Sequence, residues 1–343
     1  MSGLLLYPYG KPAITGMLKT QVEDFKVTEN LGFEPSGEGE HLFLWIEKSM
    51  LTSQDLIERV ANDFSVKPRD IGYSGLKDKI AITRQWLSLH LPGQMKSLEL
   101  PDISEYKLLD QAWHHKKLRP GTHRSNHFEV IIRNVEALPD ISREQLDLIR
   151  GEGMANYFGQ QRFGREHDNV ERALHAFSSV RRSGKLSRNK RSLYLSALRS
   201  FLFNRVLSRR IEQGYWSRPM RGDVFMLSGS RSIFYEPIND ALLKRYHQLD
   251  ISSTASLYGS GKRLLQDDAL EQEDRVLTEH ETIRQCLIRQ ESKLQMRATR
   301  VAVEELNVDH DPLEGTLGIS VTLPRGSYFT SLLDHFVDTG PGK

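Results

Sequence analysis

The strongest fold signal in the sequence is a regular alternation of hydrophobic residues near its C-terminal end. Leu317, Ile319, Val321 and Leu323 recur at every second position, which places their side chains on one face of a β-strand. A strand with one hydrophobic face is not stable without neighbouring strands, and the few residues that follow cannot cover it. We therefore expect this strand to pair with a sheet formed by the N-terminal part of the chain.

The N-terminal part of the sequence contains the strand patterns that such a sheet needs. Phe25 and Val27 share one face of a first strand, and residues 41–47 are hydrophobic on both faces, as in a central strand. Hydrophobic spacing after Thr52 then predicts a helix. Residues 80–91 are rich in β-branched and aromatic residues and predict another strand.

The middle of the chain has a different pattern from its two ends. Residues 152–302 are mostly helical in their hydrophobic spacing. A chain of 343 residues is also long for one hydrophobic core. We expect a discontinuous domain formed by residues 1–151 and 303–343, with residues 152–302 as an inserted domain.

Positive charge is unevenly distributed, although the formal net charge is only +2 and does not by itself indicate a nucleic-acid-binding protein. The run His114–Phe128 contains no acidic residue and carries Lys116, Lys117 and Arg119. A second acid-free run contains Arg181, Arg182, Lys185, Arg188, Lys190 and Arg191. Most such runs are solvated loops, but both also fit surfaces that contact phosphates.

Several other functions find no support in the sequence. The single cysteine, Cys286, excludes an internal disulfide and a cysteine-based zinc site. Residues 259–263 lack the glycine spacing of a phosphate-binding loop, so no nucleotide triphosphate site is expected. His123 and His127 lie on a loop-to-strand segment rather than on a helix, so no metal site is expected. With no signal peptide or membrane span in the sequence, a cytoplasmic protein is expected.

One loop carries a candidate catalytic residue. Asp78 lies between Lys77 and Lys79, a few residues after Gly72 and Gly75. The glycines allow another backbone to approach closely, and the lysines favour the ionised carboxylate, which suits a nucleophile or a base. An aspartate after a glycine is also ordinary turn chemistry, so the loop alone does not identify an enzyme.

The residues of this loop resemble the signature of a known family. The segment Gly75-Leu76-Lys77-Asp78-Lys79, with Gln85-Trp86 after it, is similar to that of the TruD family of tRNA pseudouridine synthases. Other blocks match the family in the same order, and they are residues 23–29, 117–128, 156–164 and 323–331.

The resemblance implies a fold and an activity. The expected fold is α+β, a pseudouridine-synthase-type catalytic domain with a mixed, mainly antiparallel sheet, interrupted by a mostly helical α/β insertion. The expected activity is the isomerisation of uridine 13 in tRNA to pseudouridine, an intramolecular transfer that needs no cofactor and no metal. tRNA is the expected partner, and the protein is expected to be a monomer.

The resemblance also implies roles for individual residues. Asp78 is the expected nucleophile, and the expected substrate-binding residues are Phe25, Asn126, Phe128 and Tyr328. The loop around Asp78 and the two basic runs supply the expected RNA contacts, which are Lys77, Lys116, Lys117, Arg119, Arg188, Lys190 and Arg191. Phe25 and Phe128 also fit as core residues of strands. Phe329 follows Tyr328 directly, so the sequence leaves open which of these two rings faces the target base.

Two other classes of protein remain as alternatives. A non-catalytic tRNA-binding or folding protein would use the same basic surfaces without needing Asp78. An RNA methyltransferase would need a glycine-rich cofactor loop after a strand, and none is apparent in the sequence.

Overall fold

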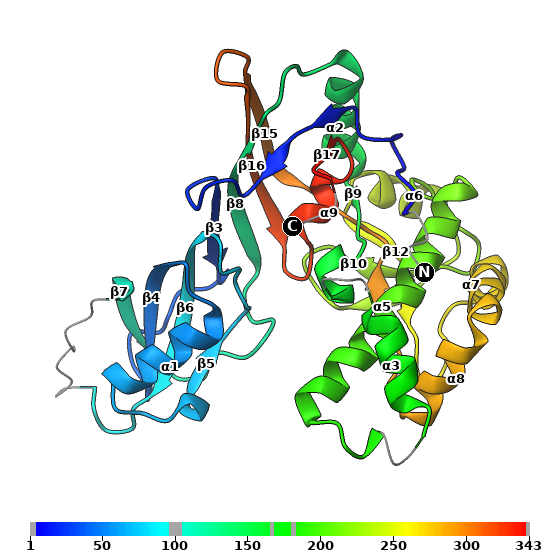
Figure 1. Cartoon of the computed structure of the whole chain (residues 1–343). Coiled ribbons are helices and arrows are strands. Elements are labelled where there is room, and N and C mark those ends of the chain that lie inside the picture. Colours follow the sequence, from blue (N-terminus) through cyan, green and yellow to red (C-terminus); the bar gives the residue numbers. More distant parts are fainter. Residues whose placement is uncertain (1–4, 96–104, 165–167, 180–182, 341–343) are drawn as a thin grey trace. The chain divides into compact units, whose positions relative to one another are not determined.

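The computed structural model of the chain describes residues 5–95, 105–164, 168–179 and 183–340 (Figure 1). The chain forms two compact units, each assembled from separated segments. The sheet unit comprises Ala13–Asp140, Val303–Gly326 and Val337–Lys343. The helical unit comprises Met1–Pro12, Ile141–Ala302 and Ser327–Phe336. These limits differ from the domain limits expected above, and the division into residues 1–151 with 303–343 and 152–302 stays a prediction.

A nine-stranded sheet, counted over the described residues, dominates the sheet unit. The strands along its main path are β15 (Glu304–Asp311), β16 (Thr316–Pro324), β8 (Ser125–Arg133), β3 (Phe25–Asn30), β6 (Ile82–His90), β4 (His41–Ser49) and β7 (Lys107–His114). Two short strands, β2 (Met17–Leu18) and β5 (Ile71–Tyr73), pair with β8 and β6. All of these pairings are antiparallel except that of β3 with β6. β16 lies between β8 and β15, so the predicted pairing of the last long strand with the N-terminal sheet is confirmed.

Helix α1 (Ser53–Asp63) covers one face of β4 and β6 (Figure 1). It begins at a capping box, because Thr52 accepts a hydrogen bond from the backbone N–H of Asp55 and the Asp55 carboxylate accepts one from that of Thr52. Its buried residues pack against the inward-facing residues of the strands, and this core contains Leu42, Leu44, Ile46, Leu56, Ile57, Val60, Leu87 and Leu89. The helix predicted after Thr52 and the central position of β4 are therefore both confirmed.

The remaining elements of the sheet unit are short. The 3-10 turn η1 (Pro68–Asp70) leads into β5. Strand β1 (Ile14–Thr15) pairs in parallel with β17 (Val337–Asp338).

The helical unit is built around the long helix α5 (Arg188–Glu212). The other helical elements are α2 (Asp140–Glu152), η2 (Gln160–Phe163), α3 (Asn169–Phe177), α6 (Asp240–His247), α7 (Asp267–Glu279), α8 (Glu281–Arg289) and α9 (Phe329–Leu333). A four-stranded sheet has the order β11 (Ile233–Tyr235), β10 (Val224–Leu227), β12 (Ile251–Leu257) and β13 (Gln295–Ala298), and β9 (Met154–Ala155) pairs with β14 (Arg300–Val301). Cys286 on α8 is buried, as expected, and burial raises the pKa of its thiol.

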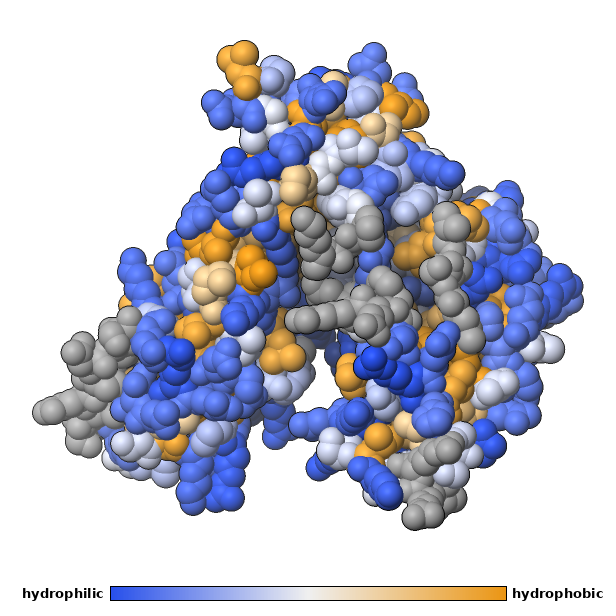
Figure 2. All heavy atoms as spheres, in the orientation of Figure 1, coloured by the Kyte–Doolittle hydropathy of each residue, from blue (hydrophilic) through white to orange (hydrophobic). Residues whose placement is uncertain are grey.

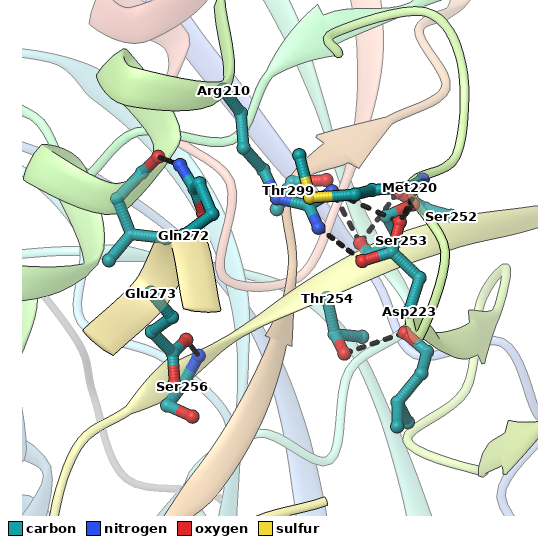
Figure 3. A network of polar contacts seen from close by, with 12 residues as sticks. Arg210, Met220, Asp223, Ser252, Ser253, Thr254, Ser256, Gln272, Glu273 and Thr299 are labelled. Atoms are coloured by element: carbon teal, nitrogen blue, oxygen red, sulfur yellow. Dashed lines mark hydrogen bonds and ion pairs between the residues drawn. The ribbon is translucent and has the colours of Figure 1, made fainter. Parts of the chain in front are cut away.

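A buried polar network joins α5 to the four-stranded sheet. The guanidinium of Arg210 points toward Asp223 and Ser253 (Figure 3) and forms a buried ion pair with the Asp223 carboxylate. That carboxylate also accepts hydrogen bonds from Ser253 Oγ at 2.6 Å and from the backbone N–H of Met220 at 2.8 Å. The pair links α5, which carries Arg210, to the turn before β10, which carries Asp223, and the Ser253 hydroxyl adds β12 to the same network.

On the face of the molecule that Figure 2 shows, hydrophilic side chains predominate and hydrophobic ones form small groups. Within the described residues, no helix is both long and apolar enough to span a lipid bilayer.

Candidate active site

The predicted catalytic residue, Asp78, lies in the loop of residues 74–81 between β5 and β6. Its side chain is 39% exposed, and its Oδ2 atom lies 2.5 Å from Nζ of Lys19. Lys19 follows β2 directly and has a left-handed backbone conformation, with φ of 57°. This conformation is unfavourable for a residue with a Cβ atom, so the surrounding structure holds Lys19 in place. The loop therefore presents a carboxylate that solvent can reach and that a cation orients.

Two of the predicted substrate-binding rings lie beside this ion pair. The Lys19 ammonium is 4.1 Å from the ring centroid of Phe25, within the range of a cation–π contact. Phe25 packs edge-to-face against Phe128, with centroids 6.2 Å apart. The rings are almost buried, with Phe25 3% and Phe128 8% exposed. The structure thus brings Phe25, Phe128 and Asp78 together through Lys19, a residue that the sequence analysis did not select.

Lys77 does not take the position that was expected of an RNA contact. Its Nζ atom lies 2.5 Å from Oε2 of Glu29 on β3, and its side chain is only 4% exposed. The backbone N–H of Trp86 donates to the other Glu29 oxygen at 3.3 Å. A buried ammonium in an ion pair is not available to a phosphate, so Lys77 instead ties the Asp78 loop to β3. Lys79, on the other side of Asp78, is exposed.

Two further hydrogen bonds hold the loop from other elements. Lys48, near the end of β4, donates to the backbone carbonyl of Asp78 at 2.7 Å. Ser53, the first residue of α1, accepts a hydrogen bond from the backbone N–H of Lys77 at 2.8 Å. Residues 77 and 78 are therefore anchored from β3, β4 and α1, and a group held from several rigid elements is pre-organised for chemistry.

Asn126 lies in the same sheet, on β8 directly opposite Glu29 of β3. Its Nδ2 atom is 3.3 Å from Nε2 of His123, and its Oδ1 atom is buried and has no hydrogen-bond partner among the described residues. His123 is buried, and desolvation is the main cause that lowers the pKa of its imidazole. An unpartnered buried amide oxygen is unusual in a protein interior and leaves an acceptor for a ligand.

Tyr328 belongs to the helical unit, whereas the residues described above belong to the sheet unit. Its hydroxyl accepts a hydrogen bond from Arg162 Nη2 at 2.5 Å, and its ring centroid is 6.0 Å from that of Phe158. Arg162 and Phe158 come from the block of residues 156–164, which therefore packs against Tyr328. Phe329 begins α9 and is only 4% exposed, so it is a core residue of this unit.

The two basic runs differ in how freely their side chains are exposed. Lys116 and Arg119 are exposed in the loop after β7, but Lys117 donates to the backbone carbonyl of Arg69 at 2.5 Å. Arg188 and Lys190 are exposed in the first turn of α5, and Arg191 is partly exposed. Arg181 and Arg182 lie outside the described residues. Over the part of the chain that the structure describes, no cluster of three or more His, Cys, Asp or Glu side chains could hold a metal ion.

The fold is shared with a solved structure, the putative tRNA pseudouridine synthase D (TruD) from Methanosarcina mazei. The TM-score is 0.72 over 99% of this chain and 97% of that chain, at 22% sequence identity. The family described as tRNA pseudouridine synthase D (TruD) matches residues 1–175 and 166–336.

Curated relatives agree with this match over nearly their whole length. The tRNA pseudouridine synthase D of Methylococcus capsulatus is 38% identical over 341 residues, which cover 97% of this chain and 94% of the relative. That of Chromohalobacter salexigens is 39% identical over 332 residues, or 95% of this chain and 93% of the relative. The protein is therefore an α+β protein of the pseudouridine synthase fold. More narrowly, the chain belongs to the TruD family.

Proposed function

We propose that this protein is a tRNA pseudouridine synthase that converts uridine 13 of tRNA to pseudouridine with Asp78 as its nucleophile. Membership of the TruD family supports the reaction class. One observation carries the assignment of the nucleophile: the Asp78 carboxylate is accessible, is paired with Lys19, and lies on a loop that three other elements anchor. A nucleophile with this support keeps its geometry while a large substrate binds.

The reaction needs no cofactor, because it rearranges bonds within one nucleoside. The N-glycosidic bond breaks, the detached uracil turns, and its C5 atom forms the new bond to C1′ of the ribose. The C5 proton is released and N1, no longer bonded to C1′, takes up a proton. Asp78 acts on the flipped-out nucleoside at the sugar or at the base, and the new bond forms before the uracil can leave. Lys19 orients the carboxylate and balances its charge until the substrate arrives.

The extruded base would be recognised by the predicted substrate-binding side chains. A nucleoside that leaves its stack is usually held by aromatic contacts and by hydrogen bonds to its base edge. Phe25 and Phe128 supply an apolar wall beside Asp78, and the unpartnered Oδ1 of Asn126 supplies a hydrogen-bond acceptor. Tyr328 is the proposed stacking ring, because its neighbour Phe329 is buried in the helical unit.

The basic residues of the two runs are the proposed phosphate contacts. These are Lys116, Lys117 and Arg119 after β7, and Arg188, Lys190 and Arg191 at the start of α5. The first turn of α5 carries these basic side chains and contains no acidic residue. Positive charge is unfavourable there, because the N-terminus of a helix is itself the positive end of the helix dipole. A bound phosphate would offset this repulsion.

The proposed organisation keeps residues 152–302 as the inserted domain of a catalytic domain formed by residues 1–151 and 303–343. The proposed working form is a monomer in the cytoplasm, where tRNA is modified. One chain carries every residue that the proposed chemistry uses.

The test compares the wild type with Asp78→Asn on tRNA transcripts that carry tritium at C5 of uridine. The wild type should release tritium from one site, and a transcript with cytidine at position 13 should release none. Asp78→Asn keeps the size of the side chain but removes the carboxylate, so release should fall to background while the dissociation constant for tRNA stays within about 3-fold. A wild type that binds tRNA but releases no tritium would favour a non-catalytic tRNA-binding protein.

A further inference from the structure

A lysine that the proposed reaction does not use lies buried beneath the Asp78 loop. The side chain of Lys48 is on β4, and the residue is only 1% exposed. Its ammonium donates one hydrogen bond to the backbone carbonyl of Asp78 and another to that of Leu51, both at 2.7 Å. It therefore links the residue proposed as nucleophile to the turn that precedes α1.

Among the described residues, the buried ammonium of Lys48 is not neutralised by an ion pair. No carboxylate in the part of the chain that the structure describes lies within ion-pairing distance of this ammonium, although Asp78 and Asp55 are near enough to act on it electrostatically. Lys77 is another nearby cation, and the side chain directly across the sheet is Thr83. Burial, as the main cause, lowers the pKa of Lys48 to about 8.

Burying an unpaired ammonium is unfavourable, and an apolar side chain of similar volume would normally stabilise such a position better. The two carbonyl contacts compensate only in part. A residue that is unfavourable for stability but contacts the backbone of the candidate nucleophile indicates a role in the site rather than in the core.

We infer that Lys48 is a positioning residue, which holds the backbone of Asp78 so that its carboxylate points to the substrate, an inference that rests on the proposed function. Asp78 is then held at its side chain and at its backbone. Lys19 contacts the carboxylate and Lys48 contacts the carbonyl. The hydrogen bond to the carbonyl fixes the backbone that carries the carboxylate. Removing this hydrogen bond should let the carboxylate move, although every reacting group is still present.

The experiment uses the full chain and the variant Lys48→Met, which keeps the length of the side chain and removes its N–H donors. Single-turnover pseudouridine formation, measured with enzyme in excess, should slow by about 100-fold, the effect of a displacement of roughly 1 Å. The dissociation constant for tRNA should change by less than about 3-fold, since the buried ammonium contacts no solvent-exposed phosphate. A lysine with only a structural role would not separate rate from affinity in this way.

A second measurement does not depend on catalysis. In the protein without RNA, hydrogen exchange of the Lys77 amide, which donates to Ser53, should become faster in Lys48→Met, while exchange in the centres of β4 and β6 stays unchanged. Lys107→Met, an exposed lysine on the neighbouring strand β7, is the matched control and should change neither measurement.

If the wild type forms no pseudouridine but the Lys77 amide still exchanges faster in Lys48→Met, the proposed function is rejected. The positioning of Asp78 by Lys48 is then retained. A wild-type rate together with wild-type exchange in Lys48→Met would overturn the inference. If Lys48→Met does not fold, Lys48→Gln decides, because its amide retains two N–H donors without the charge. The shorter Gln side chain holds the two carbonyls less well, so a folded Gln variant should show faster exchange of the Lys77 amide and slower pseudouridine formation than the wild type. Wild-type values of both in a folded Gln variant would overturn the inference, and failure of both variants to fold would assign Lys48 to the core.

Discussion

Glu29 and Lys77 form an ion pair inside the sheet unit, with Oε2 and Nζ 2.5 Å apart and side chains 0% and 4% exposed. The contact joins β3 to the Asp78 loop across 48 residues of sequence. Such pairs contribute little net stability over apolar residues, but the loss of one partner leaves a buried charge without compensation.

Lys77→Met should therefore reduce the free energy of unfolding by about 3–5 kcal/mol, because it leaves the Glu29 carboxylate buried and unpaired. The double variant Glu29→Leu with Lys77→Met should recover part of this loss. Lys79→Met is the matched control, since Lys79 is exposed in the same loop, and it should change stability by no more than about 0.5 kcal/mol. Urea unfolding measures all three. Equal stability of Lys77→Met and Lys79→Met would contradict the buried pair.

The lowered pKa of Lys48 predicts that its contribution to stability depends on pH. Its pKa is about 8 in the folded protein and 10.5 ordinarily. Between these values the unfolded state binds more protons than the native state, so stability rises with pH. Between pH 7 and pH 10, the unfolding free energy of the wild type should rise by up to about 3 kcal/mol relative to that of Lys48→Met. Other titrating groups cancel in this difference. A difference in unfolding free energy that falls as the pH rises would show that the ammonium is stabilised, not destabilised, by its site.

Much of the sheet unit could be predicted because its signals are local. The alternation from Leu317 to Leu323 predicts β16 and its pairing with the N-terminal sheet, and the hydrophobic spacing after Thr52 predicts α1. The order of the strands could not be predicted, because the parallel pairing of β3 with β6 depends on contacts between distant segments.

The site was predicted only where the residues lie in sequence motifs. Lys77 and Lys79 flank Asp78 and were expected to act on its carboxylate, but the ion pair is made by Lys19, 59 residues before it. Lys48 reaches the Asp78 carbonyl from 30 residues away. Neither lysine has a neighbouring motif that indicates these contacts, since they exist only once β2, β4 and the loop have assembled.

The two basic surfaces should differ from the catalytic residues in what their removal changes. Changing Lys116, Lys117 and Arg119 together to Gln, or Arg188, Lys190 and Arg191 together, should weaken tRNA binding and reduce its dependence on salt. Each lost phosphate contact should lower the slope of log K against log salt by about 0.7–0.9. The rate of pseudouridine formation in tRNA that is already bound should change less.

Single variants separate the residues of the first surface. Lys116→Gln should lower the salt slope more than Lys117→Gln, because the Lys117 ammonium already donates to the Arg69 carbonyl. Filter binding at several salt concentrations measures the slopes, and wild-type slopes in both triple variants would remove these surfaces from the tRNA interface.

Tyr328 and Phe329 are adjacent in sequence but should have different roles, because only Tyr328 keeps part of its ring exposed while Phe329 is 4% exposed. Tyr328→Ala should lose base stacking of about 1–3 kcal/mol, seen as slower pseudouridine formation, with a smaller loss of stability than Phe329→Ala because its ring is only partly buried. Phe329→Ala should instead lower the unfolding free energy by about 3–5 kcal/mol. Tyr328→Phe removes the hydrogen bond from Arg162 but keeps the ring, so it should retain more activity than Tyr328→Ala. A drop in Tm confined to Tyr328→Ala, together with a loss of activity confined to Phe329→Ala, would reverse the two assignments.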